Sequence, residues 1–299
     1  MTTSHDRTFA GAHPDTADHW PEIAEHWRHI GPPLRPVAQD IRFCLDAVQD
    51  WIRRRGVPRV LLLGVTPELY RLPWPKGTDF LAIDRSQAMI DTAWPGPKDA
   101  VQCTDWLTVA LPDASRDLAF CDGGLHLLPY PEQQQRLAGL LSDVLSDQGL
   151  CILRLYVPPP QREPPQAVLD DLLEGSIPNL NFLKPRLAMS LMDDAAQGVE
   201  LGEVWQALHN VAPDLTELAS KIGWPPESML AIQAYRGSRV RYYFVTVDQV
   251  RDMFCRSPGG FEVRRLCVPS YESGEQYPTI VLQRCPREAR GREQASMRP

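Results

Sequence analysis

The chain has 299 residues, of which 43% are hydrophobic and 23% charged, and its formal net charge is −7. This length accommodates one large α/β domain with an insertion, or two small domains. The acidic balance argues against nucleic acid as a main partner, because binding phosphates requires clustered Lys and Arg.

The cysteines and the start of the chain indicate the compartment. Seven cysteines are scattered without a CxxC pair, which is typical of reduced thiols in a cytoplasmic protein rather than of a disulfide framework or a zinc site. The first fifteen residues contain no apolar signal segment, and no apolar run approaches membrane-spanning length. We therefore expect a cytoplasmic protein that does not bind a membrane.

Two helices are predicted ahead of the first strand. Residues 1–14 are polar and we expect them to be disordered, whereas 15–30 predict a helix with Trp20, Ile23 and Trp27 on one face. His26 and His29 lie one turn apart, but no third strong ligand is fixed nearby, so we expect no metal site. Residues 37–54 predict a second helix.

A strand–turn–helix–strand unit follows at 59–91. The continuous apolar run at 60–63 predicts a strand buried on both faces, and Gly64 marks a sharp exit from it. A second apolar strand at 80–83 ends in Asp84, which lies 20 residues after Gly64. A carboxylate at that distance is typical of ribose binding in nucleotide-binding βαβ units. The alternative is an ordinary turn in which Asp84 caps the next helix.

Strands and helices alternate through the next seventy residues. A third strand at 100–103 leads to Asp105 and Trp106, and a fourth strand runs into Asp122 and Gly123. A helix at 132–145 and a fifth strand at 151–157 follow, so the pattern predicts a parallel sheet with right-handed crossovers.

The last 140 residues divide into an insertion and a return to the sheet. Residues 161–236 predict an almost wholly helical insertion within a unit at 158–240, placed to act as a substrate lid or, alternatively, as an oligomerisation arm. Residues 241–285 complete the domain that begins with 15–157. Their strands at 259–268 and 279–283 predict an antiparallel hairpin, and 286–299 predict a disordered tail.

Together these features resemble class I S-adenosylmethionine-dependent methyltransferases, over roughly 59–157 and 240–285. The resemblance implies an α/β, Rossmann-like, doubly wound sheet of seven strands, mostly parallel, with a C-terminal antiparallel hairpin and here a helical insertion after the fifth strand. The family's first loop is rich in glycine, and this chain keeps Gly64 but has Leu62, Thr66 and Glu68 where an acid and two further glycines are usual.

The resemblance also implies S-adenosyl-L-methionine as cofactor. Asp84 matches the acid that binds ribose, Asp105 matches the acid that receives the adenine amino group, and Trp106 is a candidate to cover the purine or to pack in the core. The full set of candidate cofactor-binding residues is Gly64, Thr66, Glu68, Asp84, Arg85, Asp105, Trp106, Asp122 and Gly123.

The reaction implied is transfer of an electrophilic methyl group, which needs alignment of the acceptor and, for a hydroxyl or ammonium, removal of a proton. Candidate catalytic residues are His126, Tyr130 and Tyr156. Candidates for binding an anionic acceptor, or simply for pairing with acidic residues, are Arg154, Tyr235, Arg239 and Tyr243.

Three functions remain open on the sequence. The first is O- or N-methylation of a small-molecule substrate, and the second transfers or cyclises the aminocarboxypropyl arm of the same cofactor. The third is a catalytically inactive, methyltransferase-like subunit that binds a partner. A homodimer through the helical insertion is a further expectation.

Overall fold

The computed structural model describes residues 19–256 and 260–286. Their main sheet has seven strands in the order β3-β2-β1-β4-β5-β9-β8. β1 to β5 are parallel, whereas β9 is antiparallel to both β5 and β8. The predicted fold class is therefore confirmed, including the antiparallel C-terminal hairpin. The bounds are β1 Arg59–Leu63, β2 Asp79–Asp84, β3 Val101–Cys103, β4 Arg116–Asp122, β5 Leu145–Arg154, β8 Phe261–Cys267 and β9 Thr279–Arg284.

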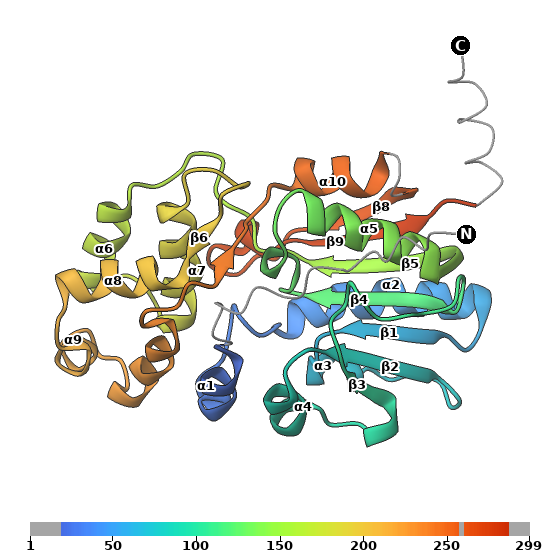
Figure 1. The fold of residues 1–299 in the computed structure, drawn as a ribbon, viewed down its shortest axis with the longest axis horizontal. Coiled ribbons are helices and arrows are strands. Elements are labelled where there is room, and N and C mark those ends of the chain that lie inside the picture. Colours follow the sequence, from blue (N-terminus) through green and yellow to red (C-terminus); the bar gives the residue numbers. More distant parts are fainter. Residues whose placement is uncertain (1–18, 257–259, 287–299) are drawn as a thin grey trace, which may run out of the picture.

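Helices cover both faces of this sheet, because the central strands are apolar on both sides (Figure 1). Val60 and Leu62 of β1 belong to a buried cluster with side chains of α2 (Ala38–Arg55) and α4 (Gln87–Ala93). Leu61 and Leu63 belong to a second cluster with α5 (Glu132–Val144) and α10 (Val247–Cys255). The short helix α3, Pro67–Tyr70, follows β1 directly.

The insertion forms a lobe beyond the carboxyl ends of the parallel strands (Figure 1). It contains α6 Pro165–Leu173, α7 Leu180–Leu191, α8 Leu201–Val211, α9 Leu215–Lys221 and the 3-10 segment η4 Pro226–Tyr235. One short strand, β6, lies within the range 161–236, for which an almost wholly helical insertion was predicted. β6 (Val199–Glu200) pairs with β7 (Arg241–Tyr242), so the segment expected to lead back into the main sheet first pairs within the lobe.

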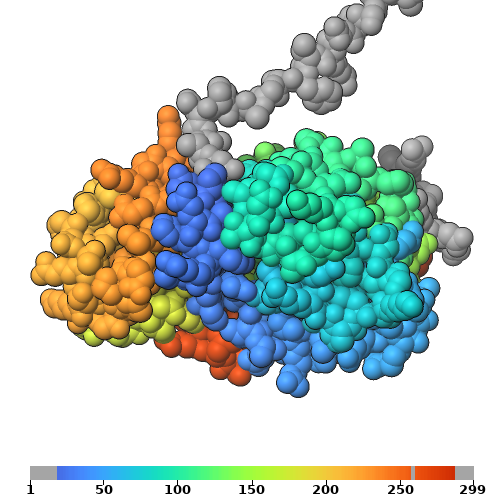
Figure 2. All heavy atoms as spheres, turned by 90° about the horizontal axis from the view of Figure 1, so that it is seen from below, coloured from blue at the N-terminus to red at the C-terminus, as the bar shows by residue number. Residues whose placement is uncertain are grey.

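The N-terminal segment lies between the lobe and the sheet, where Figure 2 shows it in dark blue. Its helix α1, Trp20–Glu25, is shorter than the helix expected over 15–30, of which residues 15–18 lie outside the described part. Pro21 lies in the first turn of α1 and fits this start, since its missing N–H needs no partner there. A 3-10 turn, Trp27–His29, follows α1.

The described residues contain neither a membrane-spanning helix nor a disulfide. None of their helices combines the length and apolar character that a membrane crossing requires. All seven cysteines lie in these residues, and each is a free thiol.

Candidate functional site

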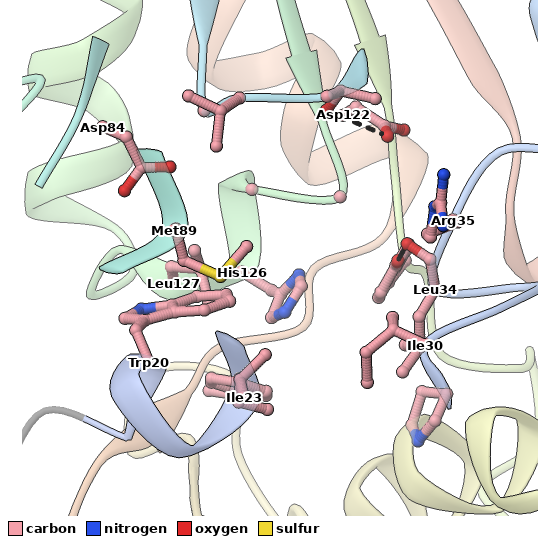
Figure 3. A pocket seen from close by; sticks show the side chains of 18 of the residues that line it. Trp20, Ile23, Ile30, Leu34, Arg35, Asp84, Met89, Asp122, His126 and Leu127 are labelled. Carbon is pink, nitrogen blue, oxygen red and sulfur yellow. Dashed lines mark hydrogen bonds between the residues drawn. The ribbon is translucent and has the colours of Figure 1, made fainter. Parts of the chain in front are cut away.

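A cavity lies where β1, β2 and β4 end, and about 1040 Å³ of empty space, part of it open to solvent, falls within it. The parallel register places Leu63 beside Ile83 and beside Cys121, so the residues that follow these three strands meet at one edge. Figure 3 shows Asp84 and Asp122 on the sheet side, with Trp20 and Ile23 of α1 across the cavity from them.

The loop after β1 leaves open space in front of Gly64. This glycine has a φ of +93°, its N–H donates to the Ile83 carbonyl at 2.8 Å, and a Cβ built on it meets no atom within 4 Å. A left-handed residue without a side chain is what a close approach of a ligand to the backbone requires. Thr66, also in the lining, donates to Asp122 Oδ2 at 3.3 Å.

Glu68 brings a carboxylate to the same wall of the cavity. Its Oε1 accepts from Arg35 Nε at 2.8 Å, whereas its Oε2 is buried without a hydrogen-bond partner. A buried carboxylate oxygen without a donor is costly unless a ligand supplies one. Glu68 therefore offers an acceptor for a cationic group in the cavity.

Asp84 ends β2 and lines this cavity and a second one. Its Oδ1 accepts from the Ser86 backbone N–H at 2.8 Å. The cap of α4 is Ser86, whose hydroxyl accepts from Met89 N at 3.4 Å. Ser86, and not Asp84 as the alternative interpretation of the sequence had it, is therefore the N-cap of α4.

The second cavity holds about 410 Å³ of empty space and shares Trp20, Asp84, Trp106 and Leu127 with the first. Trp106 is fixed in place by a hydrogen bond from its Nε1 to the Ile83 carbonyl at 2.8 Å. Asp105 Oδ1 accepts from Leu107 N at 2.7 Å in the same turn. The candidates Arg85, Asp105 and Trp106 all line this second cavity.

Asp122, at the end of β4, forms a buried ion pair with Arg154 of β5. Arg154 is 3% exposed and also donates to the carbonyls of Pro33 at 2.7 Å and Leu34 at 3.2 Å. The pair therefore ties the N-terminal segment to the sheet edge. Arg154 is committed to these contacts, so the structure does not leave it available to an anionic acceptor.

Gly123, directly after Asp122, has a φ of +57°, and a Cβ there would lie 2.7 Å from the Tyr156 hydroxyl. Only glycine allows this turn to pass so close to the tyrosine. Both residues line the main cavity.

Of the three candidate catalytic residues, His126 and Tyr156 lie together in the lining of the main cavity, whereas Tyr130 lies outside it. The His126 ring stacks on Tyr156 at 4.9 Å and on Phe244 at 5.1 Å, and its Nδ1 is buried without a partner. Burial lowers the pKa of His126 from 6.5 to about 3, so its imidazole is neutral and weakly basic at pH 7. Burial also raises the pKa of Tyr156 to about 12, and its hydroxyl donates to the Leu34 carbonyl at 2.9 Å. Tyr130 packs against the cluster on the α5 and α10 face and does not line the described cavities.

Sequence reasoning missed Lys184 of α7, which lines the main cavity and is 2% exposed. Its ammonium lies over the Tyr235 ring, 5.6 Å from the centroid, and burial lowers its pKa from 10.5 to about 8. A signal was present in the sequence. Lys184 stands four residues after Leu180 and three before Leu187, on the apolar face of its helix.

Among residues 19–256 and 260–286, no group of three or more His, Cys, Asp or Glu side chains is placed to hold a metal ion. The rings of His26 and His29, considered above as a pair, have centroids 6.4 Å apart.

Neither a protein-family model nor a curated protein sequence matches this chain. Solved structures do match. A Rhodobacter sphaeroides protein, provisionally described as a zinc-dependent alcohol dehydrogenase, is 15% identical with a TM-score of 0.58, covering 89% of this chain and 97% of its own. The N-methyltransferase NodS of Bradyrhizobium japonicum, solved with S-adenosyl-l-homocysteine, is 11% identical with a TM-score of 0.46, covering 89% of this chain and 99% of its own.

An S-adenosylmethionine-dependent methyltransferase of Methanosarcina mazei is 13% identical, covering 80% of this chain and 97% of its own, with a TM-score of 0.44. The likeness to the Rhodobacter sphaeroides protein, at 15% identity, concerns the fold alone. The seven-stranded, mostly parallel sheet and its antiparallel C-terminal hairpin are those that the resemblance to class I methyltransferases implied. The chain therefore has the Rossmann-like, seven-stranded fold of that family.

Proposed function

We propose that this protein is a class I S-adenosylmethionine-dependent methyltransferase that methylates an oxygen or nitrogen atom of a small molecule. One observation carries the proposal. Two cavities that share lining residues run along the carboxyl edge of the sheet, and all nine residues that the family resemblance selects as cofactor contacts line one or both of them. Ligands of open α/β sheets bind at that edge.

The residues present fit the cofactor. All three of Asp84, Asp105 and Trp106 line the smaller cavity. There Asp84 would accept from ribose hydroxyls, Asp105 would accept from the adenine amino group, and Trp106 would cover the purine. In the larger cavity, the unpartnered Oε2 of Glu68 is an acceptor for the ammonium of the methionine part, and Gly64 leaves room for it. When bound, the cofactor supplies a methyl group made electrophilic by a sulfonium.

The chain itself contributes positioning and exclusion of water. Side chains of α1, α7 and η4 line the cavity opposite the sheet, so an acceptor there is enclosed between them and the strand ends. His126 is a poor general base, because its pKa is lowered to about 3. Its bare Nδ1 can instead accept a hydrogen bond from the acceptor and so orient it.

Calorimetric titration of the purified protein with S-adenosylhomocysteine, S-adenosylmethionine and NAD tests the cofactor. The proposal expects micromolar binding of both adenosyl sulfur compounds and none of NAD. Absence of binding by both would refute it and would favour the inactive, partner-binding alternative. In that case, a partner for the insertion should be sought.

The alternative reaction is transfer or cyclisation of the cofactor's aminocarboxypropyl arm. It is favoured by the departure from the family's glycine loop, because Thr66 and Glu68 change the cavity wall where the methionine part of the cofactor would bind. Product analysis separates the two reactions. Adenosylhomocysteine marks methyl transfer, whereas methylthioadenosine marks transfer or cyclisation of the other arm. The homodimer through the insertion stays a prediction, which light scattering of the purified protein will test.

A further inference from the structure

The cavity lining includes the ammonium of a buried lysine. Of the three acidic residues in the same lining, Glu68 pairs with Arg35, Asp122 pairs with Arg154, and Asp84 lies at the end of β2 on the side assigned to the cofactor. Lys184 has no such arrangement, because none of the ion pairs between described residues includes it.

The surroundings of Lys184 are rings and apolar groups. Tyr235 lies beneath its ammonium, and Pro185 and Ala188 of the same helix line the cavity beside it. No hydrogen bond from its Nζ to another described residue is present, and the ring contact with Tyr235 is weak compensation for the lost water. A buried ammonium in such a setting is costly unless an anion meets it.

The shape of the same region restricts the body that carries this anion. Flat rings of Trp20, Trp27, His126, Tyr235 and Tyr242 line the cavity together with Phe244. Rings of this kind favour a planar apolar body, stacked or edge-on.

We infer that Lys184 is the anchor for the acceptor, and that the acceptor is a small molecule with a carboxylate on a flat apolar body. The inference rests on the proposed function, because it assigns the substrate class of the same site. The acceptor's carboxylate would be the partner of the Lys184 ammonium, which donates hydrogen bonds to it. Arg35, held by Glu68 beside the Gly64 loop, remains on the cofactor side of the cavity.

The test compares acids with their uncharged amides. Benzoate, cinnamate and indole-3-acetate are titrated calorimetrically against benzamide, cinnamamide and indole-3-acetamide, with and without saturating S-adenosylhomocysteine. For the wild type we expect at least one acid to bind ten-fold or more tightly than its amide. In Lys184→Met that ratio should fall to about one. Lys184→Gln gives a second neutral variant in case the first does not fold.

The matched control is Lys221→Met, since Lys221 is an exposed lysine at the end of α9 in the same lobe. Its acid preference should equal that of the wild type. If no acid binds better than its amide, or if the preference survives in both Lys184 variants, the inference is overturned.

The cofactor's own carboxylate is the other source of such an anion, and the affinity for S-adenosylhomocysteine distinguishes the two. An affinity that is unchanged in Lys184→Met supports an acceptor site, whereas a ten-fold loss assigns Lys184 to the cofactor and overturns the inference. Failure of the wild type to bind S-adenosylhomocysteine refutes the proposed function instead. The comparison of acids with amides in its absence still tests Lys184.

Discussion

Replacing Lys184 by Met should make the ligand-free protein more stable, because it removes a buried charge while keeping most of the side-chain volume. Burial lowers the pKa of Lys184 from 10.5 to about 8. The unfolded chain therefore binds this proton more tightly than the folded chain, so the stability of the wild type rises as the pH increases from 8 to 10.5. The gap between the two pKa values, at about 1.36 kcal/mol for each pH unit, corresponds to roughly 3 kcal/mol.

The assay is urea unfolding of the wild type and Lys184→Met at several pH values. We expect the variant to gain about 3 kcal/mol in free energy of unfolding at pH 7, and only about 1 kcal/mol at pH 10, where the unfolded lysine has begun to lose its proton. The titratable groups that face Lys184 do not contribute to the pH dependence of unfolding in this range. Burial lowers the pKa of His19 to about 3 and raises that of Tyr235, so both are neutral over this range.

Lys221→Met is again the control, since an exposed lysine should change the free energy of unfolding by less than about 0.5 kcal/mol at either pH. A Lys184→Met variant that is no more stable than the wild type at pH 7 would refute the reasoning. A gain that does not change with pH would refute it as well, because the gain would then come from packing rather than from the charge.

Three further predictions concern residues that line the main cavity. Asp84→Ala should weaken binding of S-adenosylhomocysteine in calorimetry by about 1 to 3 kcal/mol. The control Asp91→Ala, at an exposed position on the adjoining helix, should leave the affinity unchanged. Equal affinities of the wild type and Asp84→Ala would refute the ribose-binding role of Asp84. Gly123→Ala should lower the melting temperature, because its Cβ would lie 2.7 Å from a tyrosine hydroxyl. The control Gly139→Ala, inside α5, should raise the melting temperature. A Gly123→Ala protein as stable as the wild type would contradict the predicted steric clash. The His126 ring resonances in an NMR titration should stay constant from pH 8 to pH 5.5, because burial holds its pKa near 3, and a transition near 6.5 would show the ring to be solvated.

The sequence was sufficient wherever a feature depends on a strand and its end. The apolar runs of β1, β2 and β4 identify central strands, and the register of a parallel sheet then brings Gly64, Asp84 and Asp122 to one edge. The same reasoning placed Asp105 and Trp106, which follow β3 within a few residues. These positions are local to the sheet and require no knowledge of the rest of the chain.

The sequence was insufficient wherever two distant segments decide the environment. His126 is a plausible base until Tyr156 and Phe244 enclose it, and Phe244 is 118 positions further along the chain. Tyr130 lies four residues after His126, yet it faces the other side of the sheet. Lys184 lines the cavity only because α7 packs over the strand ends. The periodicity within α7 does not specify that packing.

The placement of α1 has a consequence for synthesis of the protein on the ribosome. α1 packs against α4 on the sheet side and against η4 in the lobe, so it touches one partner within 70 residues and another about 200 residues later. At roughly 5 to 20 residues per second, η4 is made on the order of 10 to 40 s after α1. During that interval α1 lacks its packing against η4. α1 therefore completes its packing only after η4 has been made, although it is synthesised about 200 residues earlier.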